Sequence, residues 1–187
     1  MRYVPNILSA ARLLAVVPLL GFAWAGWASP FLLLLLAAIV SDAVDGWWAR
    51  RFDAHSALGV RLDSLADYAI YIAVPLGGWW LWPEIVAREL FWFGLVVLGY
   101  LLPGAVALVR FRRLAAYHTW SAKLAVAALA VAVLVLFAGG PAWPLHLGAP
   151  LALLAGVEQT AITLTARRPR DDLPTIVHAW RARRARA

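Results

Sequence analysis

Residues 31–51 read FLLLLLAAIVSDAVDGWWARR, a long apolar run that ends in charged residues. Ten apolar residues come first, aspartates follow at positions 42 and 45, and two arginines close the segment. An α-helix needs about 20 mostly apolar residues to cross the hydrocarbon core of a bilayer, and this stretch supplies them. We therefore expect a transmembrane helix with two carboxylates near one end.

The composition of the whole chain also indicates a membrane protein. Of the 187 residues, 64% are hydrophobic and 14% are charged, whereas soluble domains have about a quarter charged. The chain has no cysteine, which excludes disulfides, thiolate metal sites and cysteine nucleophiles. The net charge of +7 does not indicate nucleic acid binding, because the basic residues cluster at the ends of apolar segments, where they contact lipid headgroups.

The hydropathy pattern predicts six transmembrane helices with short connections. They are expected over residues 6–28, 31–51, 59–82, 89–109, 119–137 and 145–166. The pair Ser29-Pro30 is expected to separate the first two helices, because proline restricts its own backbone and that of the preceding residue. The sequence thus predicts an all-α polytopic membrane protein, with a six-helix bundle over residues 1–170 and a basic tail over residues 171–187.

The basic residues favour one orientation in the membrane. When the connections are assigned alternately to the two sides, nearly all basic residues fall on the side that holds both termini. Only Arg88 lies in a connection on the other side. The positive-inside rule then places both termini in the cytoplasm.

Four aspartates are spaced so that they share helix faces. Asp42 and Asp45 are three residues apart, and Asp63 and Asp67 are four apart, so each pair lies on one face of its helix. The short link, residues 51–58, predicts that the two helices are antiparallel neighbours whose carboxylates converge near the cytoplasmic end. Carboxylates at close range repel strongly, and one or two Mg²⁺ or Mn²⁺ ions would neutralise them. The alternative is that they pair with arginines and only stabilise the bundle.

Two residues beside the first acidic pair suit a phosphate-containing substrate. Gly46 allows close approach to the backbone, and Arg50 offers a planar donor fork for a phosphate. Two metals bridged by shared carboxylates would suit phosphoryl or phosphatidyl transfer.

Residues 42–50, DAVDGWWAR, and residues 59–67, GVRLDSLAD, are separated by eight residues. Together they fit the pattern D-x2-D-G-x2-A-R-x8-G-x3-D-x3-D at every defined position, and the chain therefore resembles the CDP-alcohol phosphotransferase family over essentially its whole length. Residues 5–18, PNILSAARLLAVVP, also resemble the start of bacterial members. The resemblance implies an integral protein of the bacterial inner membrane, with its active site facing the cytoplasm.

The resemblance further implies an enzyme that transfers a substituted phosphate from a CDP-linked donor to an alcohol and releases CMP. Two divalent cations, Mg²⁺ or Mn²⁺, would be held by Asp42, Asp45, Asp63 and Asp67. Asp67 would also act as the general base on the acceptor hydroxyl. The cytidine nucleotide would be bound by Gly46, Ala49, Arg50 and Gly59. The resemblance also implies a homodimer.

Two polar residues of the first helix are candidates for contact with the substrate. Asn6 is expected near the nucleotide, or else as a helix cap. Arg12 is expected to reach the nucleotide or the headgroup, or else to extend its side chain to the membrane interface.

The acceptor alcohol is expected near residues 109–123, VRFRRLAAYHTWSAK. The candidates for binding it are Arg110, His118, Ser121 and Lys123. A lysine inside an apolar helix is costly unless it meets an anion, and a phosphorylated acceptor supplies one. With CDP-diacylglycerol as the donor, we expect glycerol 3-phosphate as the acceptor, with inositol phosphate, serine and choline as alternatives.

Two other classes of protein fit the composition less well. A divalent metal transporter would carry acidic residues along a path across the membrane, whereas only Glu84 and Glu89 lie near the far side. A purely structural membrane protein leaves Arg50 and the two glycines of the motif unexplained.

Overall fold

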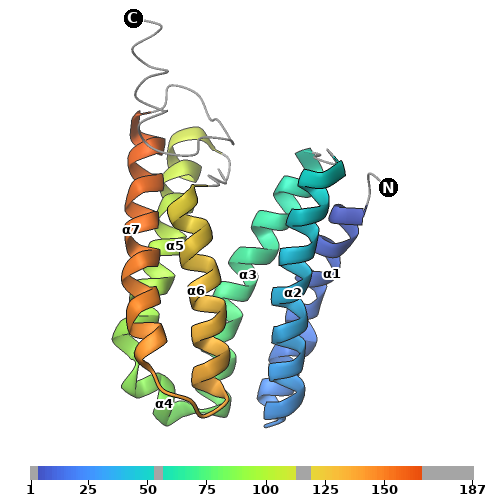
Figure 1. Cartoon of the computed structure of the whole chain (residues 1–187), viewed down its shortest axis with the longest axis vertical. Helices are drawn as coiled ribbons and strands as arrows, with labels where there is room; N and C mark the ends of the chain where they lie inside the picture. Colours follow the sequence, from blue (N-terminus) through green and yellow to red (C-terminus); the bar gives the residue numbers. More distant parts are fainter. Residues whose placement is uncertain (1–3, 53–56, 113–118, 166–187) are drawn as a thin grey trace, which may run out of the picture. The chain divides into compact units, whose positions relative to one another are not determined.

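The computed structural model describes residues 4–52, 57–112 and 119–165, and within these ranges it contains helices and no strand (Figure 1). The helices are α1 (Val4–Trp24), α2 (Ala28–Phe52), α3 (Ala57–Leu81), α4 (Pro83–Arg88), α5 (Leu90–Phe111), α6 (Trp120–Phe137) and α7 (Trp143–Thr165). The predicted all-α class is confirmed for these ranges. The chain divides into two compact units, Met1–Glu89 with α1 to α4 and Leu90–Ala187 with α5 to α7.

In the first unit, α1 packs along both α2 and α3. The ring of Phe31 on α2 fills the space beside Gly77 on α3, where an added Cβ would lie 2.6 Å from the ring. Apart from such local contacts, α2 and α3 pack mainly against α1 rather than against each other. The predicted neighbours α2 and α3 do meet, at Phe31 and Gly77, but α1 packs more closely along each of them than they pack along each other.

The turn between α1 and α2 lies earlier in the chain than predicted. Gly26 has a φ of 75°, a left-handed conformation that favours glycine, and it follows the last residues of α1. Ser29 and Pro30 lie instead in the first turn of α2, where the missing N–H of proline removes no intrahelical hydrogen bond. The predicted break at these two residues was wrong, because proline is tolerated at a helix start as well as between helices.

A short helix, α4, occupies the connection predicted between the third and fourth spans. Pro83 stands at its first position, Glu84 lies in its first turn and Arg88 in its last. This order of charges favours a helix, because the acidic residue is near the positive end of the helix dipole and the basic residue near the negative end.

Five of the described helices are long and apolar enough to cross a membrane: α1, α2, α5, α6 and α7. The chain is therefore a polytopic membrane protein. Helix α3 has 25 residues, which is also a sufficient length, but the polar residues around Asp63 and Asp67 lower its mean hydropathy. A sixth span through α3 and the cytoplasmic location of both termini stay predictions. The basic tail, residues 171–187, lies outside the described residues.

In the second unit, α7 packs against both α5 and α6. An added Cβ on Gly156 of α7 would lie 2.0 Å from the carbonyl oxygen of Gly99 on α5, and one on Gly99 would lie 2.6 Å from the carbonyl oxygen of Ala152. Leu129 of α6 lies against Gly148 of α7 in a similar way. Small residues permit such close approach between membrane helices, whose association depends on van der Waals packing.

Replacement of Gly156 by alanine should destabilise the second unit, because the new methyl group would overlap the carbonyl of Gly99. We expect the free energy of unfolding to fall by about 1–3 kcal/mol, the usual cost of overpacking. The matched control is Gly94→Ala in α5, whose added Cβ would have nothing within 4 Å and should be neutral or stabilising. Thermal unfolding in detergent micelles would measure both, and equal stability of the two variants would contradict the close approach.

Candidate functional site

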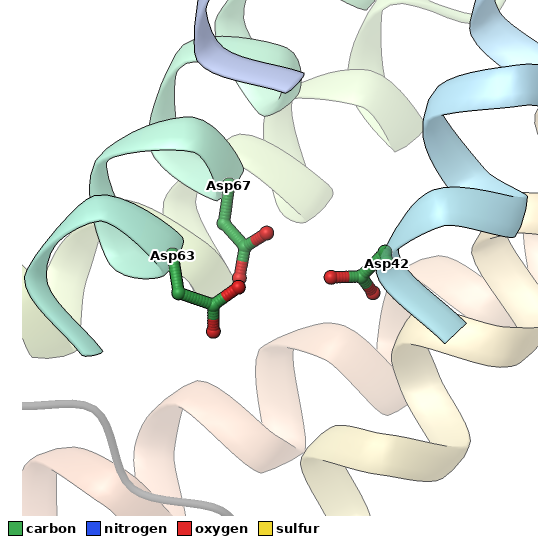
Figure 2. A group of neighbouring side chains, drawn as sticks. All are labelled: Asp42, Asp63 and Asp67. Carbon is green, nitrogen blue, oxygen red and sulfur yellow. The ribbon is translucent and has the colours of Figure 1, made fainter. Parts of the chain in front are cut away.

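Four aspartates of the first unit project from two helices toward one place. Asp42 and Asp45 lie on α2, and Asp63 and Asp67 lie on α3. Figure 2 shows Asp63 and Asp67 side by side on α3, with Asp42 facing them from α2. One carboxylate oxygen from each of Asp42, Asp63 and Asp67 lies within 4.8 Å of the other two. The carboxylates therefore converge, as the helical spacing predicts.

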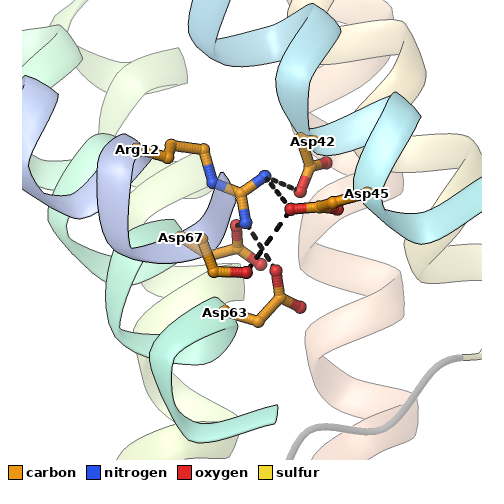
Figure 3. A network of polar contacts seen from close by, with 6 residues as sticks. Arg12, Asp42, Asp45, Asp63 and Asp67 are labelled. Atoms are coloured by element: carbon orange, nitrogen blue, oxygen red, sulfur yellow. Dashed lines mark hydrogen bonds and ion pairs between the residues drawn. The ribbon is translucent and has the colours of Figure 1, made fainter. Parts of the chain in front are cut away.

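The guanidinium of Arg12, from α1, lies among these carboxylates (Figure 3). Its Nη1 donates to Asp42 and lies 3.6 Å from the Oδ2 of Asp45. Its Nη2 donates to Asp63 and lies 3.5 Å from the Oδ1 of Asp67. One side chain thus forms ion pairs with all four acids and joins the three long helices of the unit.

The cluster has a buried side and an accessible side. The side chains of Arg12 and Asp45 are only 1% and 6% exposed, whereas those of Asp42, Asp63 and Asp67 are between 30% and 39% exposed. Ser9, one turn before Arg12 on α1, lies 3.4 Å from Asp45 and donates a hydrogen bond to it. A ligand can therefore approach the three more exposed carboxylates, while Arg12 and Asp45 form the buried floor.

The donor set fits a hard divalent cation. Carboxylate oxygens are the ligands that Mg²⁺ and Mn²⁺ prefer, and three of them lie close enough together to share an ion. The single positive charge of Arg12 cannot by itself balance four ionised carboxylates. Repulsion among the remaining charges favours the binding of further cations.

Pairing of the aspartates with an arginine was the alternative to metal binding in the sequence analysis, and the structure shows such a pairing, with Arg12 as the arginine. Of the two alternatives for Arg12, extension of its side chain to the membrane interface was wrong, because the aspartates of two other helices offer it partners inside the unit. Contact of Arg12 with the nucleotide or the headgroup stays a prediction. One clue was available: charged residues within membrane helices usually face the bundle interior and pair with one another. Ser9 and Arg12 are also three residues apart and so share a helix face.

The residues predicted to bind the nucleotide belong to the same three helices, α1, α2 and α3. Asn6 is half-buried in the first turns of α1, Gly46 is half-buried directly after Asp45, and Gly59 is half-buried near the start of α3. Ala49 and Arg50 lie near the end of α2, and their side chains lie outside the described part of the structure. The roles of these five residues stay predictions.

The residues predicted to bind the acceptor belong to the second unit. Arg110 is exposed at the end of α5, with its guanidinium 5.6 Å from the ring centroid of Phe111. Lys123 is exposed on α6, with its ammonium 5.1 Å from the ring centroid of Trp120. This cation–π contact stabilises the charge and leaves the ammonium accessible to an anion. His118 lies outside the described residues.

Ser121 takes part in a polar network that the sequence did not indicate. Its hydroxyl donates to Glu158 of α7 and lies 2.9 Å from the hydroxyl of Thr119, which caps the start of α6. Ser121 and Lys123 are two residues apart and therefore point to different faces of α6. Both residues were predicted to bind the acceptor because they are close in the sequence. In the structure, Ser121 points toward α7 and Lys123 toward Trp120.

Comparison with known proteins shows which family the sequence resembles. The profile of the CDP-alcohol phosphatidyltransferase family matches residues 2–164. The chain is 32% identical to a CDP-diacylglycerol–glycerol-3-phosphate 3-phosphatidyltransferase of Cereibacter sphaeroides, with 67% of this chain and 62% of the relative covered. It is 43% identical to a CMP-forming cardiolipin synthase of Streptomyces coelicolor, with 51% of this chain and 45% of the relative covered.

The chain thus spans less than two thirds of the length of the curated relatives that it matches. No solved structure matches it at a comparable level of significance. The family match extends over nearly the whole chain and includes every residue of the carboxylate cluster. The chain belongs to the CDP-alcohol phosphatidyltransferase family.

Proposed function

We propose that this chain transfers the phosphatidyl group of CDP-diacylglycerol to glycerol 3-phosphate and releases CMP. The observation that carries the proposal is the convergence of three carboxylate oxygens within 4.8 Å, on two helices that hold the complete family motif. The activity named for the Cereibacter sphaeroides relative supports glycerol 3-phosphate as the acceptor.

Asp42, Asp45, Asp63 and Asp67 would hold two divalent cations, Mg²⁺ or Mn²⁺. When bound, such ions supply positive charge that stabilises the pyrophosphate and the CMP leaving group. The aspartates themselves fix the place of this charge, because they project from two helices that α1 holds together. Residues expected to bind the nucleotide beside them are Asn6, Gly46, Ala49, Arg50 and Gly59.

Asp67 would act as the general base for the acceptor. The acceptor hydroxyl oxygen forms a new bond to the phosphorus of the phosphatidyl group, and the bond from that phosphorus to the CMP oxygen breaks. The hydroxyl proton passes to the carboxylate of Asp67, which is 30% exposed and therefore within reach of a substrate.

The acceptor would be bound by residues at the start of α6 and the end of α5. Lys123 and Arg110 are both exposed cations and suit the phosphate of glycerol 3-phosphate. Ser121 donates its proton to Glu158, so its oxygen accepts a hydrogen bond from Thr119 and has one further lone pair for an acceptor hydroxyl. His118 completes the proposed set of acceptor residues.

We also infer the setting of the enzyme in the cell. The bias of basic residues favours an active site on the cytoplasmic face, with both termini on the same side. The resemblance to bacterial members favours the inner membrane and a homodimer.

A second acceptor is favoured by a specific observation. The chain is more similar in sequence to the cardiolipin synthase than to the glycerol-3-phosphate enzyme, although over a shorter stretch. A synthesis of cardiolipin that forms CMP requires phosphatidylglycerol as the acceptor. Phosphatidylglycerol is therefore the second candidate.

An acceptor screen tests the proposed function. Purified protein in detergent, with CDP-diacylglycerol and Mn²⁺, should release CMP when glycerol 3-phosphate is added. Inositol phosphate, serine, choline and phosphatidylglycerol form the other arms of the screen, and chromatography of the nucleotides measures CMP. Release with phosphatidylglycerol alone would assign the second candidate, and no release with any acceptor would refute phosphatidyl transfer.

Replacement of Asp67 by asparagine should lower kcat by about 10²–10⁴-fold, because the amide cannot take the proton of the acceptor hydroxyl. The amide keeps one oxygen that can ligate a metal. Glu84→Gln, in the exposed first turn of α4, is a matched control that should leave kcat unchanged. The CMP release assay measures both variants, and full turnover by the Asp67 variant would exclude it as the base.

Mn²⁺ should raise the free energy of unfolding of the protein, because the ion binds the folded cluster and not the unfolded chain. At 100 times its dissociation constant the increase should be about 2.7 kcal/mol. The increase should be much smaller for Asp63→Asn and unchanged for Glu84→Gln. Thermal unfolding with and without Mn²⁺ checks this, and equal shifts in the two variants would rule out a metal at the cluster.

A further inference from the structure

The guanidinium of Arg12 and a metal ion would use the same three carboxylates. Nη1 of Arg12 donates to Asp42, while Nη2 donates to Asp63 and lies 3.5 Å from Asp67. These are the three acids whose oxygens lie within 4.8 Å of one another. Carboxylate lone pairs that accept hydrogen bonds from a guanidinium are less available to a cation.

The contacts of Arg12 point into the cluster rather than toward water. Its side chain is 1% exposed, and its Nε is buried without a hydrogen-bond partner in the described part of the structure. A buried charge is stabilised only by its partners, so the positive charge of Arg12 depends on the aspartates. Each aspartate in turn gains a positive neighbour.

We propose that Arg12 is a resident counter-ion with which divalent cations compete, so that it lowers the affinity of the carboxylate cluster for metal. This inference rests on the metal site of the proposed function. The four acids carry up to four negative charges, and Arg12 supplies one positive charge that repels any cation bound beside it. Arg12 holds the acids together before a metal binds and makes the bound metal easier to exchange.

A purely structural role for Arg12 predicts the opposite result. If Arg12 only holds the three helices in place, its removal lets the carboxylates spread apart and weakens metal binding. If Arg12 competes with the metal, removal of its charge strengthens metal binding. The sign of the change in affinity therefore distinguishes the two roles.

The test is the dissociation constant of Mn²⁺, measured by electron paramagnetic resonance of the free ion, on the purified full chain in detergent without lipid substrate. We expect Arg12→Gln to bind Mn²⁺ at least about tenfold more tightly than the wild type, because a full positive charge is removed from the site. Arg88→Gln is the matched control, since Arg88 also pairs with a carboxylate, that of Glu89, and is 66% exposed. The Arg88→Gln variant should bind Mn²⁺ with the same affinity as the wild type.

A conservative variant keeps the test decisive if Arg12→Gln does not fold. Arg12→Lys retains the charge, but its single ammonium cannot pair with four carboxylates as a guanidinium does. We expect its dissociation constant to fall between those of the wild type and Arg12→Gln. An affinity equal to or weaker than that of the wild type, in whichever variant folds, would overturn the proposal.

Mn²⁺ binding by the wild type distinguishes a failure of this inference from a failure of the proposed function. If neither the wild type nor the variants bind Mn²⁺, the metal site of the proposed function fails, and the competition proposed for Arg12 is refuted with it. If the wild type binds Mn²⁺ and the Arg12 variants bind no more tightly, only the competition is refuted. Without metal, the Arg12 variants should unfold at a lower temperature than the wild type. Saturating Mn²⁺ should make this difference in unfolding temperature smaller.

Discussion

The ion pairs between one buried guanidinium and four carboxylates join all the long helices of the first unit. Arg12 comes from α1, and its partners come in pairs from α2 and α3. Because α1 packs along both of the other helices, its arginine reaches acids that are far apart in the sequence. Charges of this kind inside membrane helices persist only when they are paired, so the packing of the unit and the chemistry of its site depend on the same contacts.

Much of the first unit could be predicted because short stretches of sequence determine where its helices run and which residues share a face. Apolar length predicts where helices run, and spacings of three and four residues predict which carboxylates share a face. Two features could not be predicted in this way. The break near Ser29 and Pro30 was misplaced because proline is compatible with two positions, and the conformation of Gly26 decides between them. The pairing of Arg12 requires partners at least 30 residues away, which no local pattern identifies.

In the second unit, the features that the sequence did not reveal again depend on contacts between residues that are far apart in the chain. The bond from Ser121 to Glu158 joins residues 37 positions apart, and the close approach of Gly99 and Gly156 joins helices α5 and α7. The pattern of basic residues indicated Lys123 correctly as an unusual charge in an apolar helix. Its contact with Trp120 shows how the membrane helix can stabilise that charge while leaving it accessible. The family motif therefore supports the proposed donor more directly than the proposed acceptor.

The proposed reaction and the proposed role of Arg12 both require that the acids beside Arg12 hold divalent cations. Anomalous X-ray scattering from crystals of the protein grown with Mn²⁺ would locate such ions. We expect anomalous density among the carboxylates of Asp42, Asp63 and Asp67, on their more exposed side. Anomalous density only elsewhere in the protein, with Arg12 still paired to all four acids, would contradict this expectation.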